Sequence, residues 1–169
     1  MNKNVLIFDW GDTIMRDLKL PGPMKDWQKI EWVPGTEEML KKISQSHRCC
    51  IATSASHSNT EDMIQALKRV GAEKYFNHFV SSAELGFSKP DPRFFSAVAR
   101  LIEADVEVCV SIGNLYEKDI VPAKMAGLAT IWFDENYKKG SFPNANHIIH
   151  KWEDLNEALQ QIEKQTEPY

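Results

Sequence analysis

The sequence lacks the features that mark several classes of protein. Its 169 residues carry a net charge of -4 and contain no dense basic run, so we expect neither nucleic acid nor a membrane surface as a partner. No apolar stretch is long enough to span a bilayer. The segment MNKN precedes the first predicted strand without the regions of a signal peptide. We therefore expect a cytoplasmic protein.

Cysteine is also scarce. The three cysteines are Cys49 and Cys50, adjacent in one predicted strand, and Cys109 in another. This spacing provides neither a zinc site nor a disulfide framework, so the thiols are expected to pack as small hydrophobic groups. The chain has no internal repeat, low-complexity tract or linker, and its length is typical of one domain spanning residues 1–169.

The sequence does contain short apolar strands that alternate with amphipathic helices. Strands are predicted over residues 4–8, 49–53, 78–80, 107–112, 130–133 and about 148–149. Helices are predicted from residues 34–36 onward, over 59–70, 92–102 and 117–126, and from 154 to about 164. This alternation indicates βαβ units, and therefore an α/β fold: a Rossmann-like three-layer sandwich around a mostly parallel sheet.

Residues 15–33 break this alternation. Pro21, Gly22 and Pro23 make the segment too irregular for a long helix, so we expect a flap or loop. It contains two tryptophans, Trp27 and Trp32, for which two interpretations are equally open. They either form a lid over a site or bury their area against the core.

Polar groups follow several predicted strands at their carboxyl ends, where ligands bind in open α/β sheets. Asp9 follows the first strand, and taken alone it is also compatible with a helix or turn cap. The other groups are Thr53 and Ser54 after the second strand, Lys89 before a helix, and Asn114 with Asp119 after the fourth strand. A carboxylate attacks phosphorus only when the phosphoryl charge is offset, as an ammonium, hydroxyls and a divalent cation would do. The combination suits an anionic substrate.

The order of these motifs resembles that of the haloacid dehalogenase-like superfamily of phosphotransferases, over essentially the whole chain. The matching segments are DWGDT at residues 9–13, IAT at 51–53, GFSKPDP at 86–92 and GNLYEKD at 113–119. Members with a cap domain insert it after the first motif or between the second and third. Here those intervals have room only for the flap and ordinary core elements, so no separate cap is expected. Such an open site is usually associated with large substrates or with a covering partner subunit.

The resemblance implies a nucleophile and a metal site. Asp9 would form an aspartyl-phosphate and also bind Mg²⁺. The carbonyl of Gly11, together with Asn114 and Asp119, would complete the metal site with the oxygen ligands that Mg²⁺ prefers.

The resemblance also implies the contacts to the substrate. Thr53 and the backbone N–H of Ser54 would hold the phosphoryl oxygens. Lys89 would balance charge between the nucleophile and the phosphate, which makes it both a catalytic and a substrate-binding residue.

Two positions depart from the family pattern. The usual acid/base aspartate is replaced by Gly11, and the next residue, Asp12, is interpreted either as a surrogate acid/base or as a turn residue. Asn114 stands where a metal-binding aspartate is common. Its amide oxygen still coordinates Mg²⁺ but without formal charge, so affinity should fall unless Asp119 compensates.

The sequence therefore predicts a Mg²⁺-dependent phosphomonoester hydrolase, with two alternatives. One is cleavage of a carbon–phosphorus or carbon–halogen bond by the same aspartate. The other is a catalytically weakened, phosphate-binding regulatory protein, suggested by Gly11 and Asn114 together. His57 is interpreted as a substrate contact or, in preference, as an exposed loop histidine. The natural substrate, the pathway and any oligomer are left open.

Overall fold

The computed structural model describes residues 4–166, in which six parallel strands form one sheet of order β3-β2-β1-β4-β5-β6. The strands are β1 (Val5–Phe8), β2 (Arg48–Thr53), β3 (His78–Ser81), β4 (Cys109–Gly113), β5 (Ala129–Phe133) and β6 (His147–Ile149). The chain builds outward from β1 to β3 and then returns to place β4 on the other side of β1. The strand order therefore reverses between β1 and β4, the point at which such sheets bind ligands.

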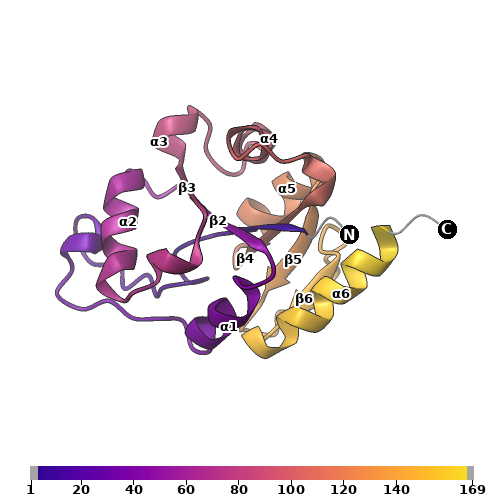
Figure 1. The fold of residues 1–169 in the computed structure, drawn as a ribbon, viewed down its shortest axis with the longest axis horizontal. Helices are drawn as coiled ribbons and strands as arrows, with labels where there is room; N and C mark the ends of the chain where they lie inside the picture. The colour runs from indigo at the N-terminus through magenta and orange to yellow at the C-terminus, as the bar shows by residue number, and fades with distance from the viewer. Residues whose placement is uncertain (1–3, 167–169) are drawn as a thin grey trace.

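Helices cover both faces of the sheet, which confirms the predicted three-layer α/β architecture (Figure 1). Buried side chains of α1 (Thr36–Ile43), α2 (Thr60–Arg69) and α6 (Leu155–Thr166) belong to one core cluster. Those of α4 (Pro92–Leu101) and α5 (Val121–Met125) belong to a second cluster on the opposite face. The remaining elements are α3 (Ser82–Leu85), the 3-10 helices η1 (Met24–Asp26), η2 (Glu73–Tyr75), η3 (Val106–Val108) and η5 (Trp152–Asp154), and the π-helix η4 (Tyr116–Ile120).

The central strand β1 is apolar throughout because both of its faces are buried. Leu6 and Phe8 contribute to the core cluster beneath α1 and α6, whereas Val5 and Ile7 contribute to the cluster beneath α4. This is the period of two that sends successive strand side chains to opposite faces. The strand ends where the apolar run ends, and the next residue is Asp9.

Local signals set the starts of two predicted helices. Asn59 and Asp62 form a reciprocal capping box at the start of α2. Asp91 caps α4, with Pro92 in its first turn, where a missing N–H costs nothing.

The helix predicted over residues 117–126 is present but is divided into two elements of different type. The segment is the π-helix η4 followed by the short helix α5. Pro122, at the start of α5, has no backbone N–H to continue an α-helical ladder from the preceding turn. Helix α3 was not predicted, and its four residues are too few to show a helical period.

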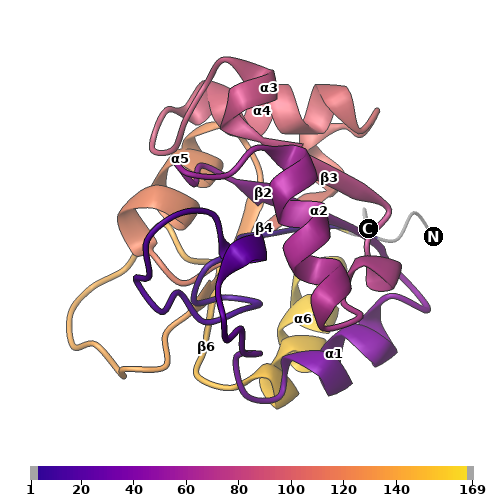
Figure 2. The same cartoon turned by 90° about the vertical axis from the view of Figure 1, so that its left-hand side faces the viewer.

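The flap over residues 15–33 is irregular, as predicted, and contains only the short helix η1. It lies beside α2 (Figure 2), where the guanidinium of Arg69 donates hydrogen bonds to the carbonyls of Lys25 and Trp27. The Trp27 side chain is buried in the core, and its indole N–H donates to the carbonyls of Pro21 and Gly22. The flap is thus held against the body of the protein by the hydrogen bonds from Arg69 and by the burial of Trp27 in the core.

Within residues 4–166, no helix has both the length and the apolar character needed to cross a bilayer.

All three cysteines are buried, which generates a prediction about their reactivity. Burial raises the pKa of the Cys49 thiol to about 12 and that of Cys109 to about 11. Because the thiolate is the reactive form, an aromatic disulfide reagent at about pH 8 should label none of the three thiols in the folded protein. After denaturation it should label all three. Rapid stoichiometric labelling of the native protein would contradict the burial of these side chains.

Candidate active site

Lys89 joins two predicted site residues that come from distant parts of the chain. Its Nζ donates to Oδ1 of Asp9 and to Oδ1 of Asp119, both at 2.9 Å, and to the carbonyl of Ala52 at 3.1 Å. Asp9 follows β1, Asp119 lies in η4 and Ala52 lies in β2. The structure therefore brings a carboxylate, an ammonium and a second carboxylate together at the carboxyl edge of the sheet.

This cluster is removed from solvent. The exposed fraction of the side chain is 4% for Lys89, 3% for Asp119 and 14% for Asp9. Burial alone would lower the pKa of Lys89, but the charges of Asp119 and Asp9 outweigh this and raise it, so the ammonium stays charged. Burial, and then the charge of Asp9, raise the pKa of Asp119 to about 6 against the opposing effect of Lys89. When both carboxylates are ionised, the cluster keeps one negative charge in excess.

Both carboxylate oxygens of Asp119 are already engaged. While Oδ1 accepts from Lys89, Oδ2 accepts the backbone N–H of Leu115 at 2.9 Å. The hydroxyl of Ser111 donates to the Asp119 carbonyl, which fixes the backbone of η4 here. A π-turn of this kind often marks a functional site. In this arrangement Asp119 orients Lys89.

Thr13 connects Asp9 with Asn114. The Thr13 hydroxyl lies 3.0 Å from Oδ2 of Asp9 and 3.3 Å from Oδ1 of Asn114, so the two oxygens face one point. The indole N–H of Trp132 donates to the Asn114 carbonyl and holds its backbone. Sequence reasoning did not single out Thr13, although it closes the first motif.

The oxygen donors beside Asp9 have the chemistry that Mg²⁺ prefers. Asp9 and Asn114 present side-chain oxygens, and no described residue donates a hydrogen bond to the carbonyl of Gly11. Residues 4–166 contain no group of three or more acidic, histidine or cysteine side chains placed to hold a metal. The donor set therefore fits Mg²⁺ by atom type, with Asp9 as its charged member.

Thr53 and Ser54 adjoin this cluster. The hydroxyl of Ser54 accepts the backbone N–H of Lys89 at 2.9 Å, and that of Thr53 accepts the backbone N–H of Ala55 at 3.0 Å. These bonds fix the loop after β2 next to Lys89. Thr53 and Ser54 therefore lie where β2 ends, with Ser54 in direct contact with the Lys89 backbone.

A cavity of about 350 Å³ opens between the flap and this loop. The residues that line it include Gly11 and Thr53 from the strand ends, Met24 and Trp27 from the flap, and His57 from the loop. The flap therefore walls a hollow directly beside the candidate site.

Asp12 lies on another side of the cluster. Its Oδ1 accepts the backbone N–H of Asp17 at 3.1 Å and lies 3.9 Å from the guanidinium of Arg16. It lines a hollow of about 200 Å³ with Asn114 and Glu135, and among residues 4–166 no hydrogen bond or ion pair joins it to Asp9 or Lys89. Its left-handed backbone, with φ of 55°, suits a turn residue. A role as acid/base stays a prediction.

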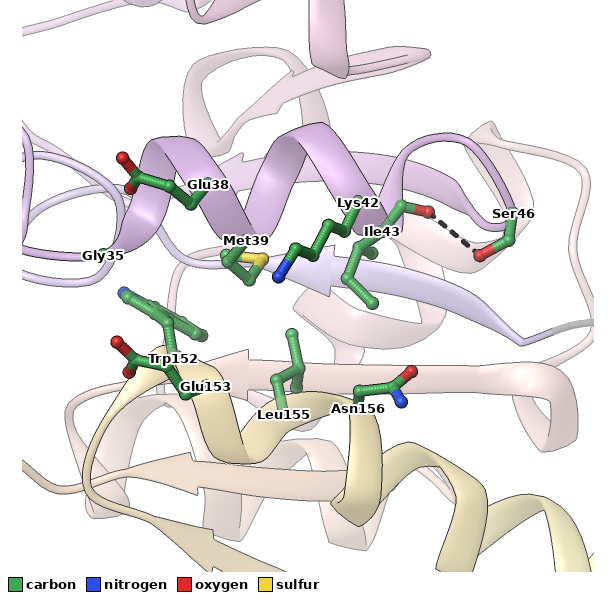
Figure 3. A pocket seen from close by; sticks show the side chains of 10 residues that line it. All are labelled: Gly35, Glu38, Met39, Lys42, Ile43, Ser46, Trp152, Glu153, Leu155 and Asn156. Atoms are coloured by element: carbon green, nitrogen blue, oxygen red, sulfur yellow. Dashed lines mark hydrogen bonds between the residues drawn. The ribbon is translucent and has the colours of Figure 1, made fainter.

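A larger cavity, of about 480 Å³, lies between α1 and the η5–α6 segment (Figure 3). Figure 3 shows the Lys42 side chain extending from α1 into the space above Leu155, with Trp152 at one end. No residue of the Asp9–Lys89 cluster lines this groove. Size alone therefore does not identify the candidate site.

The close packing around Gly113 generates a prediction. A Cβ at this position would lie 2.4 Å from Cγ of Asp119, so Gly113→Ala must displace that carboxylate and disturb its pair with Lys89. We expect a loss of about 3 kcal/mol or more in the free energy of unfolding, measured by urea denaturation. As a control, Gly86→Ala has no atom within 4 Å of the new Cβ but has a positive φ, so it should cost only about 1–2 kcal/mol. Equal losses in the two variants would contradict the collision.

Comparison with known proteins places the chain among relatives of one family. The model of the haloacid dehalogenase-like hydrolases matches residues 13–133. Glyceraldehyde 3-phosphate phosphatase from Pyrococcus abyssi is 26% identical over 102 residues, which cover 60% of this chain and 42% of that protein. The chain spans only 29–42% of the length of the first three such relatives.

Solved structures show the same fold. An uncharacterized protein from Listeria monocytogenes superposes with a TM-score of 0.82 at 23% identity, covering 95% of this chain and 99% of that one. The putative hydrolase YfnB from Bacillus subtilis, solved with bound magnesium, gives a TM-score of 0.75 at 18% identity over 94% and 99% of the two chains. Since the family model matches most of the sequence, the chain belongs to the haloacid dehalogenase-like hydrolases.

Proposed function

We propose that this chain hydrolyses phosphomonoesters through an aspartyl-phosphate formed on Asp9. The observation that carries the proposal is the buried ammonium of Lys89, held between Asp9 and Asp119 and next to Ser54. A cation so placed offsets the charge of a phosphoryl group that approaches the nucleophile. The phosphatase named among the relatives supports the same class of substrate.

In the proposed reaction, a carboxylate oxygen of Asp9 attacks phosphorus and the ester oxygen leaves with the bonding electron pair. Lys89, the Thr53 hydroxyl and the Ser54 backbone N–H hold the phosphoryl oxygens. Water then attacks the aspartyl-phosphate, which releases inorganic phosphate and restores Asp9.

Asp9, the carbonyl of Gly11 and Asn114 would hold Mg²⁺, with Asp119 acting through Lys89. Bound Mg²⁺ supplies positive charge that offsets the phosphoryl oxygens. The oxygen donors that support this site are those that converge on Thr13.

The flap lines one side of the cavity beside the candidate site, so it affects which substrates can bind there. We propose a single catalytic domain without a separate cap, with the flap covering part of the site in its place. The cavity of about 350 Å³ beside Thr53 supports a leaving group that is partly enclosed. A large substrate, a covering subunit and a cytoplasmic location stay predictions.

A phosphate-binding protein without turnover is the second candidate, favoured by Gly11 and Asn114 at positions where the family commonly has carboxylates. Turnover of an aryl phosphate, measured with and without Mg²⁺, separates the candidates. Mg²⁺-dependent turnover supports the phosphatase. Absence of turnover with retained phosphate binding supports the second candidate, and activity only on haloacids without Mg²⁺ supports carbon–halogen cleavage.

The first functional prediction concerns the nucleophile. Asp9→Asn should lower kcat on an aryl phosphate on the order of a thousandfold or more, because an amide is not an attacking group. The matched control is Asp26→Asn, which alters an exposed carboxylate on the flap and should keep full activity. Circular dichroism should show both variants folded. Comparable turnover by a folded Asp9→Asn protein would remove Asp9 from the nucleophile role.

The second functional prediction concerns the uncharged metal ligand. Asn114→Asp adds a negative charge beside the cation, which we expect to be worth on the order of 1.4 kcal/mol after desolvation. The Mg²⁺ concentration for half-maximal activity should then fall about tenfold. Asn156→Asp, on α6 and away from the cluster, should leave it unchanged. An unchanged Mg²⁺ requirement in Asn114→Asp would show that Asn114 is not a ligand.

A further inference from the structure

The departure at Gly11 leaves the leaving group without the usual carboxylic acid, and the structure offers a histidine on the same cavity wall. His57 lines the cavity of about 350 Å³ together with Gly11 and Thr53. It is exposed, and no described residue forms a hydrogen bond with its ring. The buried indole N–H of Trp10, which also lines this cavity, has no hydrogen-bond partner among residues 4–166. The cavity wall therefore carries an imidazole and an indole N–H that can form hydrogen bonds with an oxygen-bearing group.

The other ionisable groups of this cavity are engaged with each other. Lys19 Nζ donates to Oδ2 of Asp17 at 2.6 Å. Burial alone would raise the pKa of Asp17, but the hydrogen bonds from Lys19 lower it, so Asp17 has no proton to give near neutral pH. The same hydrogen bond raises the pKa of Lys19, which makes the ammonium a poor proton donor.

The carboxylates of Asp12 and Asp62 also have hydrogen-bond partners. Asp12 accepts from the Asp17 backbone and lines the opposite hollow with Asn114. Asp62, which shares a second hollow with His57, accepts the Asn59 backbone N–H in the capping box and lies 4.0 Å from Lys25. Among these groups, His57 is the one that combines a free side chain with a place on the cavity wall.

We propose that His57 is the general acid that protonates the leaving-group oxygen, taking over the task of the carboxylate absent at Gly11. This inference rests on the proposed phosphatase function. It assigns the cavity to the leaving group of an alkyl phosphate, whose alkoxide needs a proton to depart. A histidine side chain suits the task because imidazole is the group that most often transfers protons in general acid–base catalysis.

As the Asp9 oxygen bonds to phosphorus, the phosphorus–oxygen ester bond breaks and its electron pair stays on the leaving oxygen. The imidazolium of His57 transfers its proton to that oxygen, which gives an alcohol and a neutral imidazole. The imidazole then takes a proton from the water that attacks the aspartyl-phosphate, which restores the imidazolium and releases phosphate.

Two substrates that differ in their need for a proton test this role. Dinitrophenyl phosphate releases a stable phenolate, whereas glycerol phosphate releases an alkoxide. In the full chain with Mg²⁺, His57→Gln should lower kcat/KM for glycerol phosphate about 100-fold or more and change that for dinitrophenyl phosphate less than about threefold. The control is His78→Gln. His78 is the first residue of β3, so it lies at the amino ends of the strands and away from the carboxyl edge that carries the site.

The outcomes separate this inference from the proposed function. Equal losses on both substrates, no loss, or a selective loss in Asp12→Asn instead would overturn the role of His57. So would a wild-type protein that cleaves dinitrophenyl phosphate but not glycerol phosphate, and this result would leave the proposed function standing. A wild-type protein that cleaves neither would overturn both. His57→Asn, checked by circular dichroism, guards against a folding defect in the first variant.

Discussion

The ammonium of Lys89, buried between Asp9 and Asp119, is the interaction on which the rest of the site depends. Removing a charge from water costs several kcal/mol, and only well-placed opposite charges offset that cost. Each carboxylate is therefore needed where it is, because losing either would leave a buried charge less compensated. The end of β1, the π-helix η4 and the segment before α4 are thus fixed relative to one another.

Topology explains why these groups meet. The sheet reverses its strand order between β1 and β4, so the loops after these two neighbouring strands diverge to opposite faces and leave a crevice. Asp9 and Asn114 follow these two strands and share the Thr13 hydroxyl. Beside this crevice, the guanidinium of Arg16 donates two hydrogen bonds to the Glu135 carboxylate, at 2.7 and 2.8 Å. This pair joins the flap to the loop after β5.

Much of this was predictable because buried parallel strands read as continuous apolar runs. The apolar runs that end at Phe8 and Thr53 locate the carboxyl edge of the sheet. Asp9 and Lys89 meet at that edge. The rest required packing in three dimensions. No local pattern indicates that both oxygens of Asp119 are occupied, or that η4 widens into a π-turn. The pairing of Arg16 with Glu135 links residues too far apart for any helix or strand period to report.

The bond from Lys89 to Asp9 joins residues 80 positions apart, and the contact of Thr13 with Asn114 joins residues 101 apart. Such contacts close only after the intervening chain has collapsed around β1, so loop entropy delays them. We therefore expect the site to form late in folding. A nascent chain would acquire it only when η4 has been synthesised, and a protease cut between α3 and Lys89 would divide the chain between Asp9 and Lys89 while leaving each strand intact.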